Sequence, residues 1–434
     1  MCGPRETDRP PRVTRHPRTS STKSIGPQAL VLFLVAFAVY GASAYLVGRT
    51  HSPQFAYFDQ LADAFLHGRL NLVDPRAQLD LTSFAGKWYV AFPPLPALLL
   101  LPWVAARGLA GVNTVLFANI VGAANVSLVF LMLQALSRRG WTQLSLADTL
   151  WLTVLFGMGS VHWYMATVGA VWYLGQICAV PFMLLAVWLA VTTGSALLSG
   201  GALAVAMLAR PHLALCYPLL WAIALERMQG SHPIDWRRWV RWGLVGALPL
   251  AAVVLLLLGY NYARFGDPMD FGYLRMKVAG EGVGDRNTSG PLSASEWRTL
   301  GQFNVRYAPR NLRVMLLAVP GWNASTRRPA LDPRGMSLLL TTPALIYLFR
   351  ARKRAAFVVG AWLALALLLG PLVTYGSTGW RQFGYRYSLD LMTPVMILLA
   401  VAVEHSRRWP MRALIVLGVL VNAWGAYEFR YFSQ

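Results

Sequence analysis

The stretch YFDQLADAFLHGRL, Tyr57–Leu70, directly follows the first long apolar segment of the chain, and the two together indicate the fold. Its apolar residues recur at helical spacing, which predicts a helix. Asp59, Asp63 and His67 fall at positions i, i+4 and i+8, on the opposite face of that helix. An amphipathic helix beside a membrane-spanning segment is typical of a helix lying at the membrane surface.

The composition indicates an all-α polytopic membrane protein. Of the 434 residues, 56% are hydrophobic and 13% are charged, whereas soluble domains carry about 25% charged residues. Long apolar runs recur from end to end. The formal net charge of +21 comes mainly from arginine, and in such a chain it favours cytoplasmic anchoring and contact with lipid phosphate over nucleic acid. Three scattered cysteines predict neither a disulfide framework nor a metal site.

The apolar runs predict about eleven transmembrane helices, within a range of about 10 to 13. Residues 1–25 are basic and proline-rich and are expected to form a disordered cytoplasmic tail, and residues 26–434 are expected to form a single transmembrane domain. The predicted spans are 27–47, 112–136, 145–161, 174–192, 196–210, 212–225, 241–260, 335–349, 355–374, 389–403 and 412–427.

The distribution of arginine supports this topology. With the N-terminus inside, Arg138, Arg139 and the basic clusters within 237–241, 350–354 and 407–412 all face the cytoplasm, as the positive-inside rule requires. The proline-rich run at 93–110 is expected to form a re-entrant or interfacial helix on the outer side. The alternative is that it forms a twelfth span. Two large outward loops result, at 48–111 and 261–334, with shorter ones at 158–173 and 375–388. Chemistry is therefore expected on the outer face.

The predicted helix of the first loop offers two carboxylates. Asp59 and Asp63 could act as a general base and as an acceptor-orienting or metal-binding group. The alternative is that they form only the solvated face of an interfacial helix.

Arginines mark the other candidate positions. Arg210, in LARPHLAL, interrupts two apolar runs, where a charge is costly and tends to be functional unless it snorkels from an outer turn. The loop after the seventh span, beginning with Arg264, has a basic excess that would suit an anionic ligand such as a lipid phosphate or pyrophosphate. Arg381 and Arg386 lie among aromatic residues in STGWRQFGYRYSLDL, an arrangement that suits a phosphate and a prenyl chain or sugar, or simply an aromatic belt.

The segments DAFLHGRL and GKWYVAFPPLPALLLLP follow the first span, and with LARPHLAL, YNYARFGDPMDFGY and GYRYSLDLMTPVMILLA they carry a resemblance over most of the chain. The first loop resembles the first periplasmic loop of the GT-C superfamily of polyprenyl-phosphate-sugar-dependent glycosyltransferases, especially the aminoarabinose and protein-mannosyl transferase branch. The positions that match the loop of that branch are Tyr57, Gly68, Tyr89, Pro93 and Pro94.

The resemblance implies an inverting transfer of a hexosyl or pentosyl group from a polyprenyl-phosphate carrier to a lipid, glycan or protein acceptor. The family's catalytic acid would fall near His51–Gln54, where this chain has HSPQ, and Phe92 replaces a lysine before the two prolines. Asp59 or Asp63 is expected to take the role of the base, and Lys87 that of the lysine. The residues predicted to bind substrate are His51, Tyr57, Lys87, Tyr89, Arg210, Arg264, Arg381, Tyr385 and Arg386.

The expected partners are the polyprenyl-phosphate sugar donor and membrane lipids, with no nucleic acid. A divalent metal ion is the only cofactor left open, and the sequence shows no clear ligand pair for it. The expected location is a bacterial plasma membrane, with the N-terminus cytoplasmic and the active side outward. Two alternatives remain: an inactive or scaffold relative of that fold, and a lipid or solute transporter.

Overall fold

The computed structural model describes residues 26–229, 234–276, 299–325, 327–379 and 381–429. The predicted N-terminal tail, residues 277–298 of the second large loop and Trp380 lie outside the described residues. Within the described ranges, helices dominate and the strands form two small hairpins.

Seven helices in the described part of the chain are long and apolar enough to cross a membrane. They coincide with seven of the predicted spans, and the chain is thus an all-α polytopic membrane protein. These helices are α1 (Gly26–Leu46), α4 (Thr114–Arg138), α7 (Val171–Thr192), α10 (Trp236–Phe265), α14 (Ala356–Thr374), the continuous pair η6 (Arg386–Leu391) and α15 (Met392–Glu404), and α16 (Arg408–Glu428).

The other four predicted spans correspond to shorter helices. α5 and α8 each have 12 residues, or about 18 Å of helix, which is less than the roughly 30 Å of a bilayer core. Pro211 and Pro343 begin 3-10 turns that interrupt the other two spans. The count of eleven crossings stays a prediction. The segments are α5 (Leu146–Gly157), α8 (Ala196–Met207), η2 (Pro211–Cys216) with α9 (Tyr217–Met228), and α13 (Leu338–Thr341) with η5 (Pro343–Arg350).

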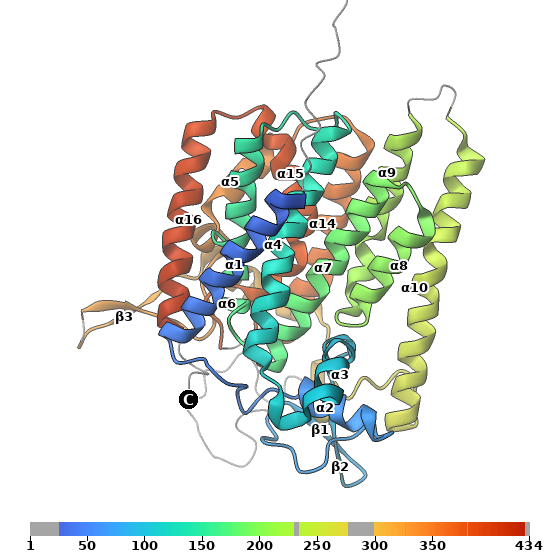
Figure 1. Cartoon of the computed structure of the whole chain (residues 1–434), viewed down its shortest axis with the longest axis vertical. Helices are drawn as coiled ribbons and strands as arrows, with labels where there is room; N and C mark the ends of the chain where they lie inside the picture. The colour runs from blue at the N-terminus through green and yellow to red at the C-terminus, as the bar shows by residue number, and fades with distance from the viewer. Residues whose placement is uncertain (1–25, 230–233, 277–298, 326, 380, 430–434) are drawn as a thin grey trace, which may run out of the picture.

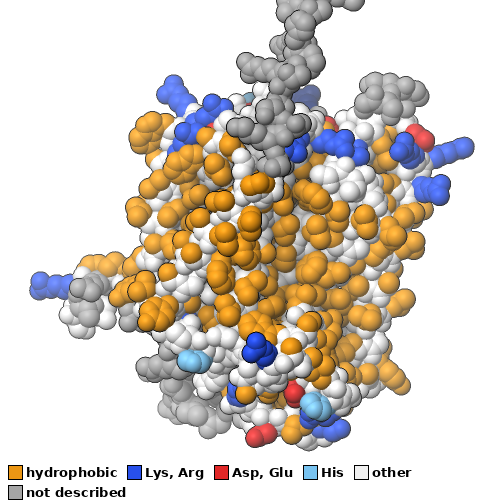
Figure 2. Space-filling model, viewed as in Figure 1, with side chains coloured by type: hydrophobic (Ala, Val, Ile, Leu, Met, Phe, Trp, Pro, Cys, Tyr) orange, Lys and Arg blue, Asp and Glu red, His pale blue; other side chains and the backbone are white. Residues whose placement is uncertain are grey.

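The long helices differ greatly in burial. The span formed by η6 and α15 is 94% buried and α7 is 67% buried, whereas α1 and α10 are each 22% buried. α15 and α7 therefore form the centre of the bundle, and α1 and α10 expose apolar side chains at its periphery. A belt of hydrophobic side chains covers the face shown in Figure 2, as expected of a surface in contact with lipid.

One end of the bundle carries the first loop, and we call it the α2 end (Figure 1). Here α2 (Phe58–Leu66) packs against α3 (Leu95–Arg107), which is followed by η1 (Leu109–Gly111). The strands β1 (Leu81–Phe84) and β2 (Lys87–Val90) form an antiparallel hairpin in which Leu81 pairs with Val90. The predicted helix in Tyr57–Leu70 is confirmed, and Gly86 forms the turn between the two strands.

The opposite end, which we call the basic end, collects arginine and lysine (Figure 2). Its cationic residues include Arg138, Arg139, Arg227, Arg237, Arg238, Arg241, Arg350, Arg352, Lys353, Arg354, Arg407, Arg408 and Arg412. The remaining short elements are α6 (His162–Met165), η3 (Tyr273–Arg275), η4 (Val305–Tyr307), α12 (Ala308–Leu317), β3 (Gly321–Asn323) and β4 (Arg328–Ala330).

Candidate functional site

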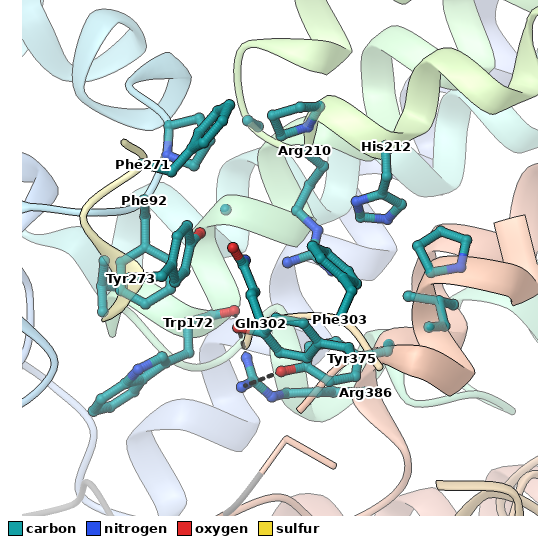
Figure 3. Close-up of a pocket in the computed structure, with 18 residues that line it drawn as sticks. Phe92, Trp172, Arg210, His212, Phe271, Tyr273, Gln302, Phe303, Tyr375 and Arg386 are labelled. Atoms are coloured by element: carbon teal, nitrogen blue, oxygen red, sulfur yellow. Dashed lines mark hydrogen bonds between the residues drawn. The ribbon is translucent and has the colours of Figure 1, made fainter. Parts of the chain in front are cut away.

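A cavity of about 280 Å³ opens at the α2 end, where seven segments of the chain converge. It receives residues from the segment before α3, the start of α7, η2 after α8, the segment after α10, the segment before η4, the end of α14 and η6. Residues lining it include Phe92, Pro93, Trp172, Arg210, His212, Phe271, Tyr273, Gln302, Phe303, Tyr375, Arg386 and Tyr387 (Figure 3).

Asp390 organises one wall of this cavity. Its side chain is 1% exposed, and its Oδ2 accepts hydrogen bonds from Arg210 Nη2 at 2.6 Å and Nε at 3.2 Å. His212 Nε2 lies 3.0 Å from the same oxygen, and Gln176 donates to Oδ1 at 3.2 Å. Because a buried carboxylate needs both a counter-charge and hydrogen bonds, Asp390 and Arg210 are best regarded as one neutral pair.

Arg386 differs from Arg210 because its acceptors are neutral. It donates to the carbonyl oxygens of Trp172 at 2.8 Å and Gly379 at 3.4 Å, and to the hydroxyl of Tyr387 at 3.4 Å. Its guanidinium also lies over the ring of Tyr387, 4.8 Å from the centroid. Among the described carboxylates, none lies within ion-pair distance of Arg386. The cavity wall thus retains one positive charge that an anion could neutralise.

A glycine makes room for this guanidinium. Gly379 has a φ of +91°, and a Cβ there would lie 3.0 Å from Arg386 Nε and 2.6 Å from Gln382 Oε1. Any other residue would be strained at this φ and would displace the side chain that carries the charge.

The rest of the lining is largely aromatic. The side chains of Phe92, Tyr273, Phe303 and Tyr375 surround the cavity in Figure 3, and Trp172 also belongs to its lining. Burial raises the pKa of Tyr273 to about 12, so its hydroxyl is protonated and able to donate at neutral pH. An aromatic lining with a guanidinium group whose hydrogen-bond acceptors are all neutral suits a ligand with an anionic group and an apolar or ring-shaped part.

The sequence did not single out Asp80, a carboxylate that is not itself among the lining residues but is hydrogen-bonded to one of them, Trp172. It lies in the irregular segment before β1, and its Oδ2 accepts a hydrogen bond from Trp172 Nε1 at 2.8 Å. Burial raises the pKa of Asp80 to about 6, although the Trp172 hydrogen bond and the charges of Arg386 and Arg381 act in the opposite direction. The local sequence around Asp80 carries no signal beyond an aspartate in a polar segment, which is common in turns.

The structure corrects the expectation that Asp59 and Asp63 share a solvated face. The Asp59 side chain is 0% exposed and pairs with Arg76, with 2.8 Å between Oδ2 and Nη2. Arg76 folds back over α2 and covers this carboxylate, which spacing within the helix could not reveal. Asp63 is partly exposed and lies 3.7 Å from both His67 and Arg69. Neither aspartate lines the cavity.

Of the predicted substrate-binding residues, the cavity lining includes Arg210 and Arg386. Arg264 is buried elsewhere and donates to the carbonyl of Val90 at 2.7 Å and to Asn261 at 2.7 Å. The backbone carbonyl of Arg381 accepts a hydrogen bond from Tyr173. Three others have packing or surface positions: Tyr385 is buried against Tyr387, Tyr89 packs on Phe265, and Lys87 is exposed on β2.

The last two predicted binding residues belong to the first loop. Tyr57 is buried and donates to the carbonyl of Leu79 at 2.8 Å. His51 is exposed and contacts the hydroxyl of Thr50. Within the described ranges, no three His, Cys, Asp or Glu side chains are grouped so as to hold a metal ion.

A pH effect on stability follows from Asp80. Its folded-state pKa of about 6 lies above the usual aspartate value of 3.8, so between about pH 4 and pH 6 the folded state retains a proton that the unfolded state releases. The contribution of Asp80 to the free energy of unfolding should therefore fall as pH rises through this window, by at most about 1.4 kcal/mol per pH unit. Melting curves of wild type and Asp80→Asn in detergent measure this contribution as the difference in stability between the two proteins. Wild type should lose stability relative to Asp80→Asn as pH rises through this window. A gain in stability relative to the variant would contradict this assignment.

The fold and the cavity together define a class: a polytopic helical membrane protein with an aromatic, cationic cavity at one end. No protein-family model matches the chain, and no curated protein matches it. Among solved structures, the chain is similar to ArnT from Cupriavidus metallidurans bound to undecaprenyl phosphate, with 14% identity and a TM-score of 0.48. The match covers 90% of this chain and 62% of that one, so the chain spans less than two thirds of the length of that protein.

Proposed function

We propose that this protein is a membrane glycosyltransferase that moves a sugar from a polyprenyl-phosphate carrier to a lipid, glycan or protein acceptor. The observation that supports it best is the Arg386 guanidinium, which faces an aromatic cavity in a membrane protein and has only neutral acceptors. A carrier phosphate supplies the missing negative charge. The sugar and the first prenyl units supply surfaces that pack on aromatic rings.

In this proposal, Arg386 and Arg210 stabilise the departing phosphate. The acceptor oxygen forms a bond to the anomeric carbon while the bond from that carbon to the carrier phosphate breaks, which inverts the anomeric configuration. Negative charge grows on the phosphate in the transition state, and fixed cations stabilise it most at that point. The Asp390 carboxylate holds Arg210 in place through two hydrogen bonds.

Asp80 is our candidate for the base that removes the proton from the acceptor hydroxyl. Asp59 and Asp63 were the sequence-based candidates, but the carboxylate of Asp59 is occupied by Arg76 and Asp63 lies at the surface. Asp80 is one hydrogen bond away from Trp172, a cavity residue. A pKa of about 6 leaves it ionised at neutral pH and close enough to that pH to accept a proton efficiently.

The positive-inside rule gives the orientation that we propose. The basic end would face the cytoplasm, which places the N-terminus inside and the cavity on the outer side of a bacterial plasma membrane. A carrier-linked donor suits this side, because the prenyl chain stays in the bilayer while its phosphate reaches the cavity.

The decisive experiment uses purified protein in lipid nanodiscs. Binding of undecaprenyl phosphate is measured first, and transfer from radiolabelled polyprenyl-phosphate sugars to membrane lipid, glycan and protein fractions is measured second. Asp80→Asn should lower transfer by about 10²- to 10⁴-fold and leave carrier binding intact, and Asp63→Asn should match wild type. If wild type neither binds the carrier nor transfers sugar from any donor, the proposal is wrong.

A further inference from the structure

A second cavity, of about 190 Å³, lies at the basic end, on the opposite side of the bundle from the first. It is formed where α7, α9 and α10 meet. The residues that line it are Thr193, Gly194, Ala224, Arg227, Met228, Arg238 and Trp242. Its volume corresponds to about six water molecules at liquid density, which leaves room for a phosphate group with its substituents.

Arginines from two helices converge on the C-terminus of α7 beside this cavity. Arg139 donates to the carbonyls of Val191 at 3.0 Å and Thr192 at 2.9 Å, and Arg227 donates to the same two carbonyls. The C-terminus of a helix offsets only about half a unit of positive charge. Two guanidinium groups at one helix end therefore leave a local excess of positive charge.

Arg238, on the first turn of α10, adds a third cation at the cavity wall. Among the described residues, no carboxylate lies within ion-pair distance of Arg139, Arg227 or Arg238. Glu226 accepts a hydrogen bond from the backbone N–H of Ala356, and Asp235 caps α10 by accepting from the backbone N–H of Arg238, so neither carboxylate is paired with a guanidinium group of this cavity. A polar cavity with unneutralised guanidinium groups is suited to a phosphate.

A glycine in the turn between α7 and α8 makes room for the side chain of Arg227. Gly194 has a φ of +69°, and a Cβ there would lie 2.6 Å from Arg227 Nε. Trp242 Nε1 donates to the carbonyl of Gly194 at 2.7 Å, which ties α10 to this turn. The guanidinium of Arg227 is thus held in a defined place at the wall of the cavity.

Tryptophans indicate the depth of this cavity relative to a membrane. Trp221 and Trp239 stack at 4.3 Å, and Trp236 packs edge-on against Trp239. Such rings favour the level of the lipid headgroups. α10 is also among the least buried long helices, so acyl chains of a molecule bound here would find lipid-facing apolar surface.

We propose that this cavity binds the phosphate of an anionic lipid headgroup. The site is separate from the cavity at the α2 end, and the inference does not rest on the proposed glycosyltransferase activity. A soluble phosphate compound shares the same chemistry, and the experiment separates the two sources.

Native mass spectrometry of the purified protein tests the proposal with three probes: phosphatidic acid, phosphatidylcholine and inorganic phosphate. Wild type should retain phosphatidic acid in preference to phosphatidylcholine. Loss of one charge-assisted hydrogen bond should weaken this binding by about tenfold or more in Arg227→Gln and in Arg238→Gln. The control Arg352→Gln removes the same charge from an exposed position at the same end and should leave binding unchanged.

Arg238 is exposed, so its variant is informative even if Arg227→Gln does not fold. Equal retention of the two lipids, or unchanged retention in Arg238→Gln, would overturn the proposal. Binding of inorganic phosphate that displaces phosphatidic acid, and that is lost in the same variants, would assign the site to soluble phosphate compounds and overturn the lipid assignment.

Discussion

Arg386→Gln is expected to lower sugar transfer by about 10²- to 10³-fold, the usual effect of removing one transition-state hydrogen-bond donor or charge. Arg386 contributes the cavity's unneutralised positive charge, because Asp390 already balances Arg210. Glutamine retains some hydrogen bonding to the carbonyls of Trp172 and Gly379, so the loss of charge should dominate over any loss of structure.

Binding of undecaprenyl phosphate to the variant, measured in nanodiscs, should weaken in parallel with transfer. Arg107→Gln, at an exposed position on α3 at the same end, provides the matched control and should behave as wild type. Full carrier affinity in Arg386→Gln would show that the phosphate binds elsewhere, and the residue's role in this cavity would have to be abandoned.

Asp390→Asn is expected to give a large loss of stability among single substitutions in this chain. The carboxylate is 1% exposed and balances Arg210 while also contacting His212 and Gln176. Removing one partner of a buried ion pair typically costs about 3–5 kcal/mol, because the other charge is left uncompensated. The Arg210 side chain is 19% exposed toward the cavity, which places the expected cost near the lower end.

Unfolding of the detergent-solubilised protein by heat or denaturant measures this cost. The double variant Arg210→Gln with Asp390→Asn should lose less than the sum of the two single variants, since no unpaired charge then remains. Asp63→Asn removes a carboxylate from a surface pair and should change the free energy of unfolding by less than about 0.5 kcal/mol. If Asp390→Asn melts at the wild-type temperature, the pair with Arg210 does not hold this wall.

Local patterns predicted the elements but not how they meet. Spacing placed a helix in Tyr57–Leu70 correctly, yet the burial of Asp59 depends on Arg76, a residue in the irregular segment that follows. The cost of a charge near the membrane pointed to Arg210, but its partner Asp390 is 180 positions away. Asp80 stayed unnoticed because its environment comes from Trp172, which only the folded chain brings beside it.

The burial of the long helices also could not be predicted from local sequence patterns. α10 and the span containing α15 both read as apolar segments, yet one is 22% and the other 94% buried. Apolar residues suit lipid and protein interior equally well, so hydropathy alone does not separate a peripheral helix from a central one. The cavity could not be placed from sequence for this reason, because its position depends on which helices occupy the centre.

The two sides of the cavity at the α2 end are anchored very differently. Arg386 and Asp390 belong to η6, which continues directly into the almost wholly buried α15. Tyr273, Gln302 and Phe303 come from short turns and irregular backbone. Changes on the η6 side should therefore decide whether any anion binds at all. Changes among Tyr273, Gln302 and Phe303 should alter which molecules fit, so diversification of substrate preference would begin on that side.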